Sequence, residues 1–175
     1  MDVILLAHGV GIFAFVIGAA SFWFKQRSDI LLYQSLVKWL SAANYFLLGA
    51  NSAGVLNILM FVRNLAFINK TKYRKLYASK LPLYFFIGVS IIATIFTFSG
   101  LFSILLGATF IFYTIILWND NPKTIRIGTL IKDPIWLVYN FIIGAYALAL
   151  LQLFTIISVT FSYIKFDTNL GKEKQ

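Results

Sequence analysis

The fold is decided by one uncharged stretch in the middle of the chain, LPLYFFIGVSIIATIFTFSGLFSILLGATFIFYTIILW, which runs from Leu81 to Trp118. A single helix over these 38 residues would be about 57 Å long, nearly twice the roughly 30 Å hydrocarbon thickness of a bilayer. The stretch must therefore fold back on itself. Because Ser99-Gly100 is the only turn-like pair near its middle, we predict two membrane helices, Leu83–Phe98 and Leu101–Trp118.

The composition of the whole chain agrees with a membrane protein. Of its 175 residues, 60% are hydrophobic, 18% are aromatic and only 12% are charged, whereas a soluble domain carries roughly 25% charged residues. This excludes a soluble globular fold, and the absence of cysteine excludes disulfides. The net charge of +9 is typical of nucleic-acid binding when it stands alone. Beside apolar runs of bilayer length it indicates membrane topology instead, and we expect no nucleic-acid partner.

The rest of the chain contains five further apolar runs, so that the sequence predicts an all-α membrane protein with seven transmembrane helices. Polar or turn-forming segments separate the runs. We expect helices at Val3–Phe24, Ile30–Gly49, Ala53–Asn69, Ile125–Gly144 and Ala147–Ile164.

The basic residues predict the orientation of these helices. Seven crossings place 12 of the 15 Lys and Arg residues on one face of the membrane, which the positive-inside rule makes the cytoplasmic face. We therefore expect a multi-pass plasma-membrane protein with its amino terminus outside and its carboxy terminus in the cytoplasm. The twelve are Lys25, Arg27, Lys70, Lys72, Arg74, Lys75, Lys80, Lys123, Arg126, Lys165, Lys172 and Lys174.

The two halves of the sequence resemble each other when the chain is shifted by 95 positions. Trp23 then aligns with Trp118, Phe46–Ala50 with Phe141–Ala145, and the charged loops and short turns coincide. We predict a 3+1+3 parallel repeat of three-helix bundles, an arrangement associated with SWEET carriers. Its parts are a first repeat over residues 1–80, a linker helix over 81–99 and a second repeat over 100–175. The alternative is seven unrelated helices of similar hydropathy.

A family resemblance rests on three segments. Ala7–Gly18, Asn44–Gly49 and Tyr139-Asn140-Phe141 before a glycine turn resemble the YgjV-type bacterial inner membrane proteins, over nearly the whole chain. The resemblance implies an inner-membrane location and a distant relationship to PQ-loop/SWEET and PnuC-type carriers. The chain departs from that wider group, because it has no Pro-Gln pair and only Pro134 matches the hinge prolines of SWEET helices. The resemblance therefore implies the fold of these carriers rather than a sugar-like solute.

Polar residues inside the predicted helices are the candidate binding residues, because each is costly in hydrocarbon unless it lines a cavity or finds a partner. Asn44 and Tyr45 correspond, under the 95-residue shift, to Tyr139 and Asn140, and Asn57 corresponds to Gln152. Amides and phenols bind uncharged polar solutes through several hydrogen bonds. The alternative is that these pairs only hold neighbouring helices together.

Two further positions suggest a proton site and a gate. His8 in the first helix is a candidate for proton coupling, with a simple interfacial hydrogen-bonding role as the alternative. Lys38 and Asp133 are equivalent positions and are candidates for an inner gate, with Pro134 as a hinge. The alternative is that Lys38 and Lys132 extend to the headgroups beside Trp39 and Trp136, and we expect Arg63 to contact lipid phosphates in the same way.

The sequence contains no motif of an enzyme. Metalloprotease and phosphate-loop patterns are absent, and one histidine without cysteine cannot supply a metal site. We expect no catalytic activity, no metal and no cofactor. The prediction is a carrier for a small neutral polar solute, with the lipid bilayer as its environment and homo-oligomerisation left open. The alternative is a non-transporting membrane scaffold or regulator.

Overall fold

The computed structural model describes residues 3–20, 27–68, 70, 77, 79–119 and 121–167. Within them the regular structure consists of seven α-helices of 16 to 22 residues. The helices are α1 (Val3–Ala20), α2 (Arg27–Leu47), α3 (Asn51–Ile68), α5 (Leu81–Phe96), α6 (Leu101–Trp118), α7 (Pro122–Ile142) and α8 (Tyr146–Asp167).

The fold-back of the uncharged stretch is confirmed, since α5 ends at Phe96 and α6 begins at Leu101, after Gly100. Four helices (α1, α3, α6 and α8) are long and apolar enough to cross a membrane, and α5 is a shorter apolar helix. Charged residues such as Lys38 in α2 and Asp133 in α7 lower the apolar content of the remaining two. Trp23, Lys25 and the basic segment 71–76 lie outside the described residues.

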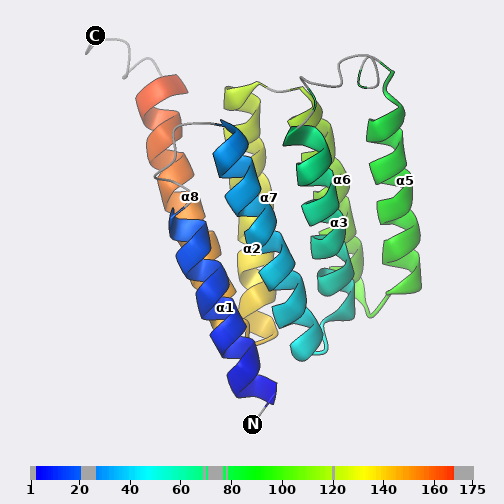
Figure 1. Cartoon of the computed structure of the whole chain (residues 1–175), viewed down its shortest axis with the longest axis vertical. Helices are drawn as coiled ribbons and strands as arrows, with labels where there is room; N and C mark the ends of the chain where they lie inside the picture. The colour runs from blue at the N-terminus through cyan, green and yellow to red at the C-terminus, as the bar shows by residue number, and fades with distance from the viewer. Residues whose placement is uncertain are drawn as a thin grey trace.

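The helices form two layers, and consecutive helices run in opposite directions (Figure 1). One layer contains α1, α2 and α3 in that order, and the other contains α8, α7 and α6. The edges are closed by contacts of α1 with α8 and of α3 with α6. The remaining helix, α5, packs outside the layers against α3 and α6. The N-terminus and the turns after α2, α5 and α7 share one end of the bundle (Figure 1), which we call the N-terminal end.

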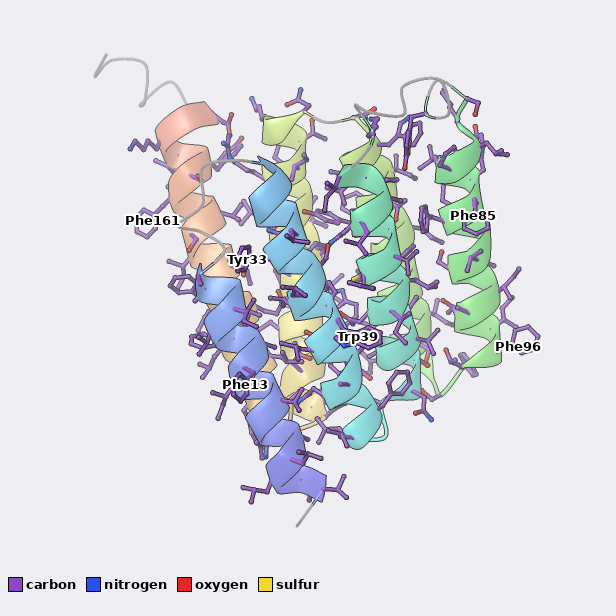
Figure 2. The ribbon with its side chains drawn as sticks, viewed as in Figure 1. Phe13, Tyr33, Trp39, Phe85, Phe96 and Phe161 are labelled. Atoms are coloured by element: carbon purple, nitrogen blue, oxygen red, sulfur yellow. The ribbon has the colours of Figure 1, made fainter. Side chains whose placement is uncertain are left out.

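Large apolar side chains cover the outside of the bundle, as a protein surrounded by lipid requires. Phe13, Trp39, Phe85, Phe96 and Phe161 extend away from the helices (Figure 2), and Phe96 is 85% exposed. Exposed apolar side chains of Val size or larger occur on every described helix. They are consistent with contact between the whole circumference and hydrocarbon.

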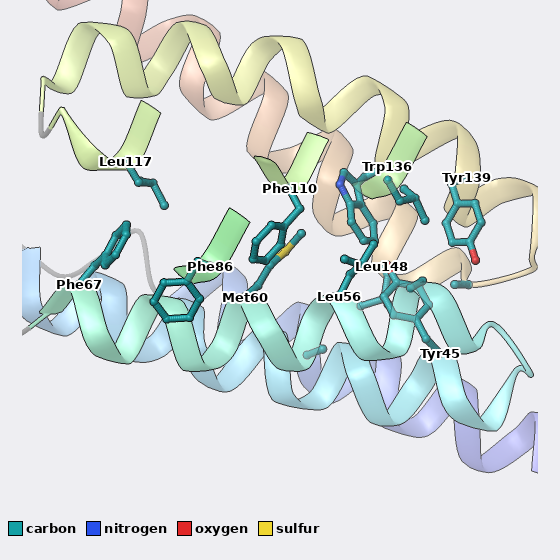
Figure 3. Close-up of a cluster of buried hydrophobic side chains, with 14 residues drawn as sticks. Tyr45, Leu56, Met60, Phe67, Phe86, Phe110, Leu117, Trp136, Tyr139 and Leu148 are labelled. Atoms are coloured by element: carbon teal, nitrogen blue, oxygen red, sulfur yellow. The ribbon is translucent and has the colours of Figure 1, made fainter. Parts of the chain in front are cut away.

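The interior combines an aromatic core with many polar side chains. Figure 3 shows the core, in which side chains from both layers and α5 meet. Its members are Ala14, Tyr45, Ala53, Leu56, Met60, Phe67, Phe86, Leu106, Phe110, Leu117, Trp136, Tyr139, Ala145 and Leu148. The polar groups buried beside it come mainly from α2, α3, α6 and α7, so hydrogen bonding contributes to the packing of the interior as well as apolar contact.

An aromatic cluster fixes α3 against α6 at the end opposite the N-terminal end. The Phe67 ring lies 5.8 Å from the Trp118 ring and 6.3 Å from the Tyr77 ring. The Tyr77 hydroxyl donates to the Ala66 carbonyl oxygen at 2.6 Å, and burial raises the pKa of this phenol. Lys70 Nζ donates to the Trp118 carbonyl oxygen at 2.5 Å. This pairing sets the polar side chains of α3 beside those of α6.

Candidate functional site

Two matching helix ends position the first group of candidate residues. Gly49 after α2 and Gly144 after α7 have φ angles of 72° and 77°, which glycine adopts without steric cost. Each makes the paired bonds of a Schellman cap: the N–H of Ala50 donates to the Tyr45 carbonyl oxygen at 2.8 Å, and the N–H of Ala145 donates to the Asn140 carbonyl oxygen at 2.9 Å. The two caps therefore place Tyr45 and Asn140 at the same depth.

A hydrogen bond between these two side chains joins the layers across the centre of the bundle. The Tyr45 hydroxyl donates to Asn140 Oδ1 at 2.7 Å, between residues 95 positions apart. On the α1 side, Asn44 Nδ2 donates to the Ala7 carbonyl oxygen at 2.5 Å. We call Asn44, Tyr45, Tyr139 and Asn140 the amide–tyrosine layer; it connects α1, α2 and α7.

Two amide atoms of this layer are buried without a partner. Asn44 Oδ1 is an acceptor and Asn140 Nδ2 is a donor, and neither forms a hydrogen bond with any described group. Asn140 is 0% exposed. A buried polar group left unsatisfied costs about 1–3 kcal/mol, so the closed layer retains an unused acceptor and an unused donor.

Aromatic rings pack beside the layer and separate it from the rest of the interior. The Trp136 ring lies 5.9 Å from the Tyr45 ring and 6.2 Å from the Tyr139 ring, and Figure 3 shows these three side chains in the same part of the core. Trp136 Nε1 donates to Thr109 Oγ1 on α6 at 3.1 Å. Trp136 is thus fixed at one point of its indole and bounds the layer on the side toward Asp133.

A second polar group lies two helical turns deeper and carries charge. Lys132 forms an ion pair with Asp133 through Oδ1, and its Nζ lies 4.5 Å from the centre of the Tyr113 ring. Asp133 is 1% exposed, and its Oδ2 has no hydrogen-bond partner. Lys38 on α2 lies within electrostatic range of Lys132, Asp133 and Arg63. We call Lys38, Arg63, Lys132 and Asp133 the charged cluster.

Arg63 on α3 is 2% exposed and is bonded only to neutral groups. Nη1 donates to Thr114 Oγ1 at 2.8 Å, and Nη2 donates to Asn64 Oδ1 at 3.1 Å. The guanidinium carbon lies 4.9 Å from the centre of the Phe110 ring and 5.7 Å from that of Tyr113. Among the described residues no carboxylate lies within ion-pair distance of Arg63.

The remaining candidates are not members of these two groups. His8 stacks on the Tyr146 ring at 6.2 Å and borders a hollow of about 470 Å³ near the amino terminus. Asn57 donates from Nδ2 to the Ala53 carbonyl oxygen of its own helix at 2.9 Å, and no hydrogen bond between described residues joins it to Gln152, which is also buried. Pro134 lies inside α7 on its exposed side, next to Asp133.

Comparison with known families gives a match over almost the entire chain. The model of the Imp-YgjV family, described as bacterial inner membrane protein, matches residues 5–169. The chain belongs to this family. The match includes both the amide–tyrosine layer and the charged cluster. No curated protein and no solved structure gives a significant match.

Membership of the Imp-YgjV family confirms the membrane location and the resemblance expected from the sequence. The structure joins Tyr45 to Asn140 by a hydrogen bond and to Tyr139 by ring packing, whereas the Asn44 side chain bonds to Ala7 on α1 instead. The gate expected of Lys38 and Asp133, with Pro134 as a hinge, stays a prediction.

One expectation about the side chains of this Imp-YgjV protein was wrong, and so was one part of the alternative for the charged residues. Arg63 does not reach lipid phosphates, because its side chain is enclosed between α3 and α6. Trp136 does not lie at the membrane surface, because its ring is buried in the core. Sequence reasoning also missed Thr109 and Thr114 as partners, and the only signal for them was a hydroxyl residue among large apolar neighbours.

Proposed function

We propose that the chain is a carrier for a small polar solute that works by alternating access between two three-helix units. The units are α1–α3 and α6–α8, with α5 as the connecting helix, in a 3+1+3 parallel repeat. The bounds of α2 and α7, Arg27–Leu47 and Pro122–Ile142, are displaced by the 95 positions that also separate Tyr45 from Asn140. The contacts of α1 with α8 and of α3 with α6 support the same two-fold arrangement.

The observation that carries the proposal is the pair of unused amide atoms in the amide–tyrosine layer. Asn44 Oδ1 accepts and Asn140 Nδ2 donates, and both are buried. A polar solute with its own donor and acceptor would satisfy both atoms and offset their desolvation. Packing alone gives no reason to bury two amides with half of their hydrogen-bonding capacity unused.

Movement of the two units would open this layer. The Tyr45–Asn140 bond joins α2 of one unit to α7 of the other, so rocking the units apart at the N-terminal end breaks it and admits solute. We place that end on the outer side of the membrane, because the basic segments of the sequence connect the opposite ends of the helices. Reporter fusions at Asn51 and Lys72 should then label opposite sides, and labelling of one side only would refute this topology.

The binding test is a thermal-shift panel of neutral hydroxylated and heterocyclic solutes on purified protein. Stabilisation of the wild type that is lost in Asn140→Ala supports the carrier. The control is Asn51→Ala, which removes an exposed amide at the start of α3 and should keep the shift. A wild type that no solute stabilises favours the scaffold, and counterflow in proteoliposomes then separates binding from transport.

A further inference from the structure

The charged cluster is not electrically balanced. It contains three basic side chains, Lys38, Arg63 and Lys132, and one acidic side chain, Asp133. Lys132 occupies Oδ1 of that carboxylate, and Arg63 reaches no carboxylate among the described residues. Of the other acidic residues that the structure describes, Asp29 lies in the first turn of α2, and Asp167 ends α8 and pairs with Arg126. The charged cluster, as described, therefore carries an excess of positive charge.

An excess charge of this kind is costly at membrane depth. Ionised side chains inside a bundle normally pair with one another or line a pathway for a charged species. A guanidinium stays protonated at any physiological pH, so Arg63 cannot relieve the cost by losing its proton. Contacts with the rings of Phe110 and Tyr113 offset only part of the cost, since a cation–π contact is weaker than a paired charge.

Arg63 retains the donors that an anion would need. A guanidinium has five N–H groups, and Arg63 uses one on Nε, one on Nη1 and one on Nη2 for Asn64 and Thr114. A second N–H remains on each terminal nitrogen. Two terminal N–H groups form the fork that binds carboxylate or phosphate oxygens in pairs.

We propose that Arg63, together with Lys38 and Lys132, binds an oxyanionic group, and that the solute of this carrier is a small organic anion. The proposal rests on the carrier function above and changes the solute class, because amides and phenols alone suggested a neutral molecule. Tyr45 lies seven positions after Lys38, and Asn140 lies seven positions after Asp133, or about 10 Å along each helix. A solute of that length places its anionic group in the cluster and its neutral polar groups in the amide–tyrosine layer.

The same oxyanion chemistry is available from two sources, a soluble carboxylate or phosphate and the headgroup of an anionic lipid. Arg63 is enclosed between α3 and α6, which favours a soluble anion. The experiment therefore measures thermal unfolding in an uncharged detergent with succinate or inorganic phosphate, against chloride at equal ionic strength. A parallel arm compares nanodiscs of phosphatidylcholine with nanodiscs that contain phosphatidylglycerol.

We expect succinate or phosphate to stabilise the wild type in detergent and in phosphatidylcholine nanodiscs. Arg63→Met, which removes the charge and keeps an unbranched side chain, should weaken this binding at least about tenfold. The control Arg126→Gln removes an arginine that Asp167 already pairs at 2.6 Å and should leave the affinity unchanged. If Arg63→Met does not fold, Lys38→Met takes its place, with a loss of several-fold.

Three results would overturn the inference: no shift with either soluble anion, an equal shift in Arg63→Met, or stabilisation by phosphatidylglycerol alone. Failure of the carrier proposal is seen separately. Loss of the anion effect with retained binding of neutral solutes at the Asn140 site refutes only the oxyanion subsite. The absence of both effects refutes the carrier as well.

Discussion

Removal of the Tyr45 hydroxyl tests whether the bond between the two layers stabilises the bundle. In Tyr45→Phe, Asn140 Oδ1 loses the hydrogen bond that it accepts from the Tyr45 hydroxyl at 2.7 Å. Both the oxygen and the nitrogen of the Asn140 amide are then without a partner. Hydrogen bonds between membrane helices average about 0.6 kcal/mol, with a maximum near 1.7 kcal/mol, and a buried unsatisfied group costs about 1–3 kcal/mol. Because Asn140 is fully buried, we expect a loss of about 1–2 kcal/mol in the free energy of unfolding.

The assay is thermal or SDS-induced unfolding of purified protein, followed by tryptophan fluorescence. A loss of this size lowers the midpoint of a 150–250-residue protein by about 2–8 °C. Tyr139→Phe is the matched control, because it deletes the same group from a neighbouring ring whose hydroxyl forms no hydrogen bond with described residues. Its effect should stay within about 0.5 kcal/mol.

A double variant separates the lost bond from general disturbance of the core. Asn140→Leu removes both amide atoms, so that adding Tyr45→Phe no longer leaves an unpaired acceptor. The two changes together should therefore cost less than the sum of the single changes. Strict additivity, or a Tyr45→Phe loss no larger than that of Tyr139→Phe, would refute the interpretation of this bond as a tie between the layers.

Three further perturbations follow from contacts of the same structure. Gly11→Val should lower the free energy of unfolding by about 1–3 kcal/mol, because a Cβ at position 11 would lie 3.1 Å from Asn44 Nδ2. Gly9→Val should be nearly neutral, because no neighbouring side chain or other helix lies within 4 Å of a Cβ there. Equal losses in the two variants would contradict this reasoning. Trp136→Phe should lower the free energy of unfolding by about 1 kcal/mol, because it removes the hydrogen bond to Thr109. In a protein that already carries Thr109→Val, the same change should cost little more. If Trp136→Phe costs the full amount in both backgrounds, the hydrogen bond is not the cause. Asp167→Asn should lower the free energy of unfolding by at most about 1 kcal/mol, because it breaks a partly exposed ion pair with Arg126. This loss should become smaller at high salt. A loss that does not depend on salt would argue against an ionic origin.

Much of the helical arrangement could be predicted from hydropathy and turn residues. The prediction of Leu101–Trp118 matches α6 at both ends, because the uncharged stretch can only break at Ser99-Gly100. The first helix was predicted to end at Phe24, whereas α1 is described as far as Ala20. Periodic hydrophobicity says little about depth inside a bundle whose outside is also apolar, and for that reason Arg63 and Trp136 were assigned to the wrong surroundings.

The candidate site was predictable in its members and less so in its contacts. The 95-residue shift selected Tyr45 and Asn140 as equivalent positions, and their side chains meet. The same shift paired Asn57 with Gln152, yet Asn57 bonds to its own helix. Under the proposed repeat, equivalent side chains meet only near the axis that would relate the two halves, and the distance of a residue from that axis is not encoded in its spacing.

The Tyr45–Asn140 contact illustrates an arrangement that one chain can adopt and two identical chains cannot. In the proposed two-fold repeat, positions 45 and 140 are equivalent, and their side chains meet at the centre. A symmetric dimer of identical three-helix chains would place two copies of one residue there, either two tyrosines or two asparagines. A single chain carries different residues at the two positions, so that a phenol donates to an amide. The same holds for Lys38 and Asp133, which are also 95 positions apart.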